Sequence, residues 1–300
     1  MSLQQPIQIN ISPTNPAQYL ACCGIFEMVA RFDSAAVSRW ETGAATRFLI
    51  ETMINEGNLV DCVVKTFTSW ENYWRERFFE NTTEVTRVDV SFALSDELHR
   101  IVKLDWWYER LNADGSFNGN NSAWKMFSGN QSVQQVVEDR LIPSCRKLHS
   151  EMQTLSLAEL FNARTLIKGQ GFGFNPSSSR NALDVGYSPN DLHLDVATHS
   201  FVELLAMIGV QHFFPPRTRP SGGHESTRGF MREHGKRNYY FQHCLWRENL
   251  PVVLARAYAC GSLADERSGQ LLKSERASRD KYANLSPSTL TYFEKGNSND

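Results

Sequence analysis

With 300 residues, 41% of them apolar and 21% charged, the chain has the composition of an ordinary globular protein. The formal net charge of −2 excludes a protein that is polycationic as a whole. No stretch is apolar over the length of a membrane span, and the N-terminus lacks the basic and apolar regions of a signal peptide. We therefore expect a soluble, cytoplasmic protein without a membrane partner.

The N-terminal segment predicts a strand, a turn and a helix. Apolar and polar residues alternate from Ile7 to Ile11, which is typical of a strand with one buried face. Asn15 suits the N-cap of the following helix, Pro16 suits its first position, and Gln18 could close a capping box. Residues Thr46–Glu51 predict a further strand.

The helix predicted for Ala17–Phe32 carries Gly24 in its interior. Glycine at such a position costs about 1 kcal/mol relative to alanine, so we expect close packing against a strand as compensation. Glu27 is expected on the exposed side of this helix. The six cysteines of the chain show no C-x-x-C spacing, and we expect small, buried apolar residues of a reduced protein without a metal or other cofactor.

Aromatic residues dominate the next segment. Trp70, Tyr73, Trp74 and Phe78 recur at helical spacing, which predicts a helix over Ser69–Glu80. Such a stripe is more often part of a core than a platform for a ligand.

A hairpin and a long polar loop follow. Alternation over Val88–Leu94 and Val102–Tyr108 predicts two antiparallel strands with one buried face. The chain then enters a loop rich in glycine, asparagine and serine at Asn112–Ser122, and long polar loops of this kind are usually functional or disordered. Flat aromatic rings and a cation around this loop favour stacking on, or clamping of, nucleic acid. The candidate residues are Trp106, Trp107, Trp124 and Lys125.

Short similarities connect the two halves of the chain. A helix predicted for Ser200–His212 contains Leu-Ala-x-x-Gly at 205–209, and the first helix contains the same pattern at 20–24. If this echo is real, it indicates two related strand-plus-helix units. We expect an N-terminal unit at residues 1–160 and a C-terminal unit at residues 161–300, or one continuous domain.

Positive charge is concentrated near the C-terminal end. Residues 217–256 carry eight lysines and arginines against three acidic residues, an excess that suits phosphate groups, although a solvated face is the alternative. A strand is predicted for Asn238–Trp246, and a helix for Leu250–Cys260 that ends at Gly261. The predicted phosphate contacts are Arg217, Arg219, Arg228, Arg232, Lys236 and Arg237.

Catalytic motifs are not evident among the eight histidines and six cysteines. The sequence contains no H-E-x-x-H, G-x-S-x-G or cysteine-plus-base pattern, so we expect a protein that is not an enzyme. A metal-independent ribonuclease needs only one positioned histidine and a cation. His224 or His234 in the basic segment could serve in that alternative.

Four segments, taken in order, are distinctive: NPAQYLACCGIFEMVARF (15–32), LDWWY (104–108) with KMFSGNQS (125–132), LDVGYSPNDLHLDVATHSFVELLAMIGVQHFFP (183–215) and LWRENLPVVLARAYACG (245–261). Together they resemble a family of CRISPR-associated proteins, the third of the Csb group, from type I-U systems, now called type I-G. The sequence departs from the family pattern at Ala17 and over residues 127–131.

The resemblance implies a subunit of an RNA-guided, Cascade-like effector complex in antiviral defence. Its expected partners are CRISPR RNA, target DNA and the other effector subunits. The implied fold is α+β with an RRM-like (ferredoxin-like) βαββαβ core, large insertions and two related units. Two alternatives stay open: an endoribonuclease that processes CRISPR RNA, and a protein–protein assembly module of the complex.

Overall fold

The computed structural model describes residues 5–79, 82–107, 122–127, 131–152, 154–176, 195–213, 229–232, 239–261, 263–279 and 282–292. Its strands are β1 (Ile7–Ile11), β2 (Val37–Glu41), β3 (Thr46–Glu51), β4 (Asn72–Phe79), β5 (Thr82–Ser95), β6 (Leu98–Leu104), β7 (Thr165–Lys168), β8 (Asp195–Thr198), β9 (Phe230–Arg232), β10 (Tyr239–Trp246), β11 (Leu250–Pro251), β12 (Gly269–Arg279), β13 (Tyr282–Leu285) and β14 (Thr289–Thr291).

The helices alternate with these strands, which makes the mixed α+β class a confirmed prediction. They are α1 (Pro16–Phe32), α2 (Glu56–Ser69), α3 (Val133–Val136), α4 (Ile142–Glu151), α5 (Leu157–Asn162), α7 (Ser200–Gly209) and α8 (Val252–Ala259), with a π-helical turn at Val137–Leu141 and a 3₁₀ turn, η2, at Val210–Phe213. In the described part of the chain, no helix is long and apolar enough to cross a membrane.

The N-terminal sheet has the antiparallel order β1-β3-β2-β11. Strand β3 lies between β1 and β2, which are joined through α1. In the described residues the next strand of the sheet is the C-terminal β11, so the complete βαββαβ unit stays a prediction. Contacts between β2 and β11 also cross the division predicted near residue 160.

The start of α1 follows the sequence prediction closely. The side chain of Asn15 accepts hydrogen bonds from the backbone N–H groups of Ala17 (3.0 Å) and Gln18 (3.4 Å), and Pro16 occupies the first turn. The Gln18 side chain instead accepts a hydrogen bond from the backbone N–H of Ser12 at 2.8 Å, so it ties the helix to the end of β1 rather than closing a capping box.

The helix predicted for Ser69–Glu80 is wrong, because most of this segment is strand β4, paired with β5. Trp70 follows the end of α2 and Trp74 lies on β4, and both indole N–H groups donate to Glu138 Oε1, at 3.2 and 2.6 Å. Tyr73 points the other way and is 64% exposed. The aromatic residues have the spacing of one helical face because the first of them follows the end of α2 and the others lie on β4. The backbone of β4 forms its hydrogen bonds with β5.

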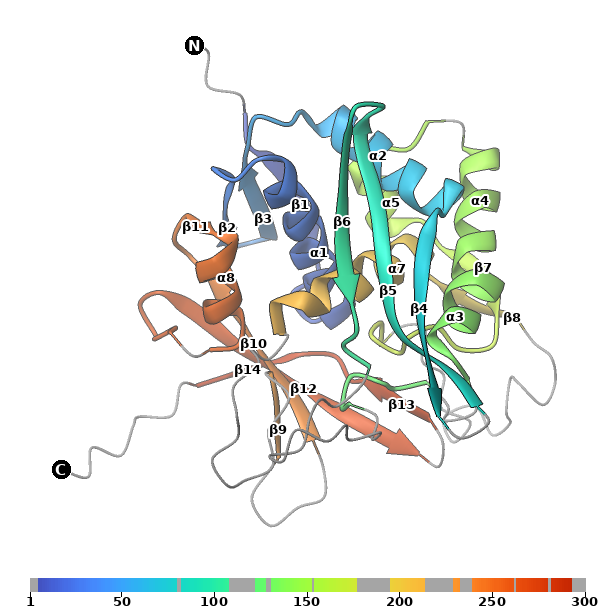
Figure 1. Cartoon of the computed structure of the whole chain (residues 1–300). Coiled ribbons are helices and arrows are strands. Elements are labelled where there is room, and N and C mark those ends of the chain that lie inside the picture. The colour runs from blue at the N-terminus through green and yellow to red at the C-terminus, as the bar shows by residue number, and fades with distance from the viewer. Residues whose placement is uncertain are drawn as a thin grey trace.

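The predicted hairpin is present as β5 and β6, but its second strand, predicted over Val102–Tyr108, begins at Leu98 and ends at Leu104. Its inward residues, Val88, Val90, Val102 and Leu104, are fully buried, whereas the intervening positions of β6 are exposed. Figure 1 shows β4, β5 and β6 as a tall sheet over α2, with the C-terminal strands β9, β10, β12, β13 and β14 gathered at the bottom of the view.

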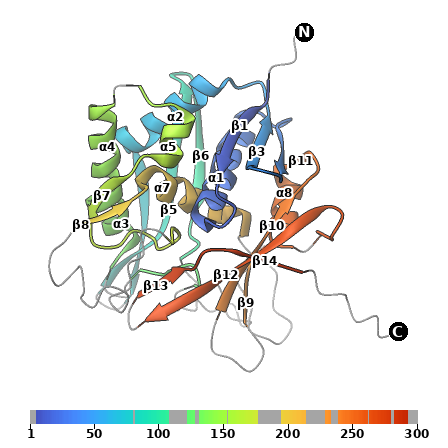
Figure 2. The same cartoon turned by 180° about the vertical axis from the view of Figure 1, so that it is seen from behind.

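Helices α1 and α7 cross in the middle of the molecule, and both views show them side by side (Figures 1 and 2). A Cβ atom on Gly24 would overlap the backbone oxygen of Leu205, and one on Gly209 would overlap the backbone oxygen of Leu20. Gly24 is thus packed against a helix rather than the expected strand. The contact is reciprocal: the glycine of each Leu-Ala-x-x-Gly pattern lies against the leucine backbone of the other. The two similar segments are therefore related by an approximate two-fold axis.

Candidate functional site

The basic segment predicted to contact phosphates is largely outside the described residues. The structure gives the backbone of Arg232, in β9, and the two residues on either side of positions 214–228, Phe213 and Gly229. A Cβ atom on Gly229, which has φ +81°, would lie 2.6 Å from the Phe213 ring, so these two residues are held together. Outside the described residues are Arg217, Arg219, Arg228, Lys236 and Arg237, together with His224 and His234.

The tryptophans proposed to stack on nucleic acid lie in the core. Trp106 and Trp107 are 2% exposed and Trp124 is 1% exposed. The Trp106 indole N–H donates to the backbone oxygen of Met207 at 2.9 Å, and the Trp124 ring packs 4.6 Å from that of Phe230. A ring enclosed in this way cannot stack on a base, which corrects the sequence-based interpretation of these three residues.

Lys125 is the fourth residue of that predicted group. Its side chain is half-buried, and Nζ lies 5.4 Å from the centre of the Phe127 ring, the range of a cation–π contact. Within the described part of the chain, this loop exit therefore packs inward around aromatic side chains.

Among the described residues, three histidines are buried around the crossing helices, and two of them lie outside any ion pair with a carboxylate. His243 is fully buried between Tyr19 and Phe241, with ring centres 4.3 and 4.7 Å away, and burial lowers its pKa to about 3. His199, 9% exposed, lies 2.8 Å from the side-chain nitrogen of Asn175, and its pKa is also lowered by burial. Both are neutral side chains of the interior at pH 7.

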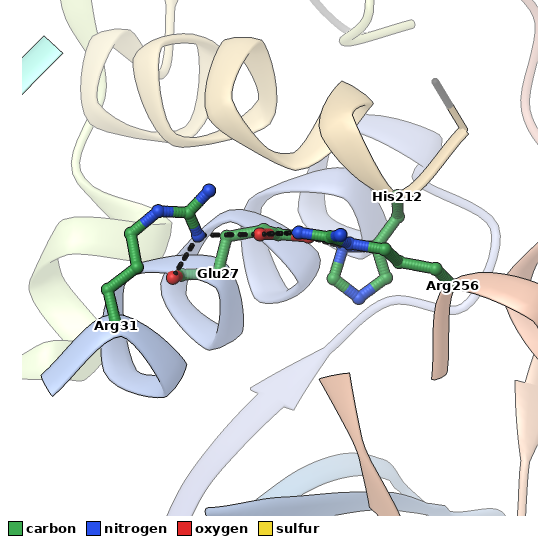
Figure 3. A network of polar contacts seen from close by, with 4 residues as sticks. All are labelled: Glu27, Arg31, His212 and Arg256. Atoms are coloured by element: carbon green, nitrogen blue, oxygen red, sulfur yellow. Dashed lines mark hydrogen bonds and ion pairs between the residues drawn. The ribbon is translucent and has the colours of Figure 1, made fainter. Parts of the chain in front are cut away.

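A polar cluster at one end of the α1–α7 crossing is the strongest candidate site in the described residues (Figure 3). We call it the Glu27 cluster; it consists of Glu27, Arg31, His212 and Arg256. The Glu27 carboxylate is fully buried, and Arg256 donates to it twice, from Nε to Oε1 at 2.7 Å and from Nη2 to Oε2 at 2.6 Å. Arg31 Nη1 reaches the same Oε2 at 2.7 Å.

Three separate elements supply this cluster. Glu27 and Arg31 are one turn apart on α1, His212 lies on η2 directly after α7, and Arg256 comes from α8. The close approach of α1 and α7 at their glycines brings His212 Nδ1 to 2.9 Å from Glu27 Oε1. The bidentate contact between Arg256 and Glu27 joins two residues that are 229 positions apart in the sequence.

The electrostatics of the cluster leave it with a positive charge. Burial alone would raise the pKa of Glu27, but contacts with His212 and Arg256 hold it well below its ordinary value, so the carboxylate is ionised. Burial lowers the pKa of His212. The contact with Glu27 opposes this shift, but burial together with the positive charges of Arg256 and Arg31 outweighs it, so this imidazole is neutral at pH 7. Two guanidinium groups against one carboxylate give a net charge of +1.

The solvent reaches the arginines and not the acid or the imidazole. The side chains of Arg31 and Arg256 are 26% and 38% exposed, whereas those of Glu27 and His212 are 0% exposed. A carboxylate beside an imidazole is the arrangement of a general base. Here both groups are enclosed, so the part of the cluster open to a ligand is its cationic edge.

A second buried acid, Glu203, lies in the first turn of α7. Its carboxylate accepts hydrogen bonds from the backbone N–H groups of Phe172 and Asn175, both at 2.9 Å, and so fastens the glycine-rich segment to the helix. Burial raises the pKa of Glu203 to about 7, and the amide hydrogen bonds only partly oppose that rise. Among the described residues, no group of three metal-ligating side chains is present here or elsewhere.

The sequence predicted none of the Glu27 cluster. Glu27 was expected on an exposed helix face, but α1 is buried at every position from Pro16 to Val29. The available signal was a single acid inside an otherwise apolar or small-residue helix, which requires a cationic partner once it is buried. Nothing in the local pattern identifies that partner as Arg256.

Comparison of the chain with protein-family models, with curated proteins and with solved structures gives no significant match. The function is therefore inferred from the residues of this chain and from their geometry.

Proposed function

We propose that this protein is a non-catalytic subunit of a type I-U (I-G) CRISPR effector complex, in which it contacts CRISPR RNA, target DNA or both. The proposal begins with the four segments that resemble the third Csb family. In complexes of this type, base pairing reads the target sequence, while protein subunits hold the strands through their backbone and shape.

The observation that carries the proposal is the convergence of these segments in space. The first and third cross at Gly24 and Gly209, the second reaches the third through the hydrogen bond from Trp106 to Met207, and the fourth reaches the first through Arg256 and Glu27. Residues scattered over 15–261 thus form one contiguous interior.

Two further observations support the nucleic-acid role and the fold assigned to it. Residues 217–256 hold eight basic residues against three acidic ones, which suits a phosphate backbone. The strand order β1-β3-β2 and the reciprocal contact of the echoed helices are the features expected of RRM-like units in two related copies.

The test is purification of the full chain together with the proteins encoded beside it. We expect a stable complex from which CRISPR RNA is recovered, and we expect the chain alone to leave repeat RNA intact with or without divalent metal. Specific cleavage that is lost in His224→Ala or His234→Ala would establish the ribonuclease alternative. Failure to join any neighbouring protein or RNA would overturn the proposal.

Replacing part of the basic segment tests its role inside the complex. In the combined variant Arg228→Ala, Arg232→Ala, Lys236→Ala and Arg237→Ala, we expect weaker RNA retention at raised salt and an unchanged melting temperature. Each side chain that binds a phosphate contributes roughly 0.7 to 0.9 to the slope of log affinity against log salt, so its removal should lower the slope by that amount. RNA retention equal to that of wild type at every salt concentration would exclude this segment.

An assembly role is the second candidate, because α8 presents large apolar side chains to solvent. Val253 is 69% exposed and Leu254 is 44% exposed. Val253→Ser with Leu254→Ser should leave the fold intact, since neither side chain is in the core. Loss of complex formation without loss of RNA binding by the isolated chain would favour the assembly role.

A further inference from the structure

A row of three arginines runs along the end of α1, outside the segment 217–237. Arg256 and Arg31 both bind Glu27 Oε2, at 2.6 and 2.7 Å, so their guanidinium groups are close neighbours. Arg100 lies in the first half of β6, and its Nε donates a hydrogen bond to the backbone oxygen of Arg31 at 2.9 Å. Its guanidinium carbon lies 5.8 Å from the centre of the Phe32 ring. Each guanidinium is thus held in place by a partner within the fold.

Among the described residues, Glu27 is the one carboxylate with which this row forms ion pairs. The three arginines carry +3 and Glu27 carries −1, so the row and its paired acid have a net charge of +2. The acid that follows α1, Asp33, directs its carboxylate to the Thr52 hydroxyl at 2.7 Å and the Met53 backbone N–H at 2.9 Å. His212 is neutral at pH 7 and fully buried, so it does not alter this balance.

Hydrogen-bond donors remain on the exposed edges of these side chains. A guanidinium has five N–H groups in a fixed plane. Arg256 uses Nε and Nη2 for Glu27, and Arg31 uses Nη1 for the Glu27 carboxylate and backbone oxygen. The other nitrogens can bind an anion that approaches from solvent, and planar forks of this kind are suited to phosphate.

The structure assigns a second phosphate-binding site to Arg31, Arg100 and Arg256, which we propose holds the backbone of single-stranded RNA. The assignment rests on the proposed function for the identity of the strand. The buried Glu27 carboxylate acts as the positioning group, because it fixes two of the three cations in place before the ligand arrives. Preorganised side chains lose less rotamer freedom on binding, so this row should contribute more per charge than a solvated arginine.

A matched control is available on the N-terminal sheet. The side chain of Arg39 is 26% exposed, the same value as that of Arg31. Arg39 contacts two carboxylates, those of Glu51 at 2.6 Å and Glu41 at 3.3 Å, so its charge is already compensated. Arg39→Gln therefore removes an equally exposed arginine without removing unpaired positive charge.

The test measures the fluorescence anisotropy of a labelled oligouridylate with the purified full chain over a range of salt concentrations. Arg31→Gln, Arg100→Gln and Arg256→Gln should each weaken binding about three- to tenfold at low salt, and each should lower the salt slope by about 0.7. Arg39→Gln should change neither quantity. Arg100→Gln does not touch Glu27, so it tests the site even if Arg256→Gln lowers the melting temperature.

Other outcomes would overturn the assignment in distinguishable ways. If the wild-type chain does not bind the oligouridylate, or if all three variants bind as wild type does, then the row is not a phosphate site. The proposed function would survive that result if the chain still joins a complex that retains CRISPR RNA. If the variants bind RNA normally but fail to join the complex, the row contacts a protein partner instead.

Discussion

Two glutamates on the crossing helices are equally buried and have opposite electrostatics. Glu27 on α1 and Glu203 on α7 are both 0% exposed. The pKa of Glu27 lies well below its ordinary value, because arginine and histidine contacts outweigh burial, whereas burial raises that of Glu203 to about 7. Burial in the same interior therefore does not determine the charge of a carboxyl group.

The difference lies in what each carboxylate contacts. Glu203 accepts hydrogen bonds from uncharged backbone amides, which offset only part of the loss of hydration. Glu27 contacts two permanent cations, one of them in bidentate geometry. Glu203 therefore holds a loop in place within the fold, whereas Glu27 positions two positive charges at the surface.

The largest expected effect comes from separating the helices that carry both acids. In Gly24→Leu the new side chain would overlap the backbone of α7 at Leu205, which cannot move aside as a flexible side chain would. Overpacking costs about 1–3 kcal/mol where a core can adjust. The backbone of α7 cannot adjust in this way, so we expect a greater loss of stability than for any of the substitutions below. The melting temperature and soluble yield should both fall.

Gly43 provides the control for that substitution. A Cβ atom at Gly43 meets nothing within 4 Å, so Gly43→Leu should melt as wild type does. A normal melting temperature for Gly24→Leu would show that the crossing is not as close as described. Normal folding with failure to join the complex would instead make the small-residue surface a partner interface.

The next largest effect is expected at the charged acid. Glu27→Ala leaves two arginines and a buried imidazole without their carboxylate, and breaking a buried pair in this way typically costs about 3–5 kcal/mol. Denaturant unfolding measures the change. Glu27→Gln should lie between wild type and Glu27→Ala, because the amide oxygen still accepts a hydrogen bond.

Glu51→Ala is the matched control for this prediction. The Glu51 side chain is 46% exposed and pairs with Arg39 at 2.6 Å. Exposed pairs of this kind contribute about 0–1 kcal/mol. If Glu27→Ala were no more destabilising than Glu51→Ala, the Glu27 cluster would be solvated rather than buried.

Glu203 should make the stability of the protein depend on pH. Because the pKa of Glu203 is about 7 in the folded chain and 4.5 ordinarily, its stabilisation is fully present below pH 4.5 and is lost as the pH rises through 7. Glu203→Gln removes the titrating group and with it this dependence. Its amide nitrogen cannot accept a hydrogen bond from one of the two backbone N–H groups, which is a loss that does not vary with pH. Relative to wild type, the variant should gain stability between pH 5 and pH 8, on the order of 3 kcal/mol from the size of the shift.

The comparison between variant and wild type is essential to that measurement. Burial lowers the pKa values of His199, His212 and His243, so their stabilisation is present above about pH 6.5 and is lost on acidification. In the wild-type curve of stability against pH, the contribution of these histidines has the opposite slope to that of Glu203. The histidine contribution cancels when the stability of wild type is subtracted from that of the variant. A difference that does not vary between pH 5 and pH 8 would mean that Glu203 is ionised throughout.

Local sequence signals predicted the elements better than they predicted the two acids. Alternation over Ile7–Ile11 and Val88–Leu94, the Asn15 cap and the small-residue helices all depend on neighbours within a few residues, and the structure contains each of them. The segment at β4 was mistaken for a helix because pairing with β5 decides its conformation. Although β5 directly follows β4 along the chain, the spacing of apolar residues within one segment does not record which strand pairs with it.

The same limit applies to the candidate site. Glu27 was assigned to an exposed face because one helix gives no information about how many neighbours cover it. Trp106 and Trp124 were assigned to a ligand surface because aromatic residues beside a polar loop serve either a core or a binding face. Only the packing of α7 and β10 around them distinguishes the two, and that depends on contacts distant in sequence.

The smallest expected effect concerns which arginine keeps Glu27 ionised. Arg256 makes two hydrogen bonds to the carboxylate and Arg31 makes one, so Arg31→Gln should leave Glu27 charged and reduce stability by no more than about 1 kcal/mol, as for a part-exposed pair. Arg256→Gln should be more destabilising at pH 7. Because the folded pKa of Glu27 then rises toward its ordinary value, this variant should lose less stability on acidification than wild type does. Unfolding of both variants at pH 4 and pH 7 measures this. The lowered pKa of Glu27 stabilises the folded state above the ordinary pKa of this acid, and that stabilisation is lost as the pH falls toward the folded pKa. If the two variants lose the same stability on acidification, the two arginines share the role.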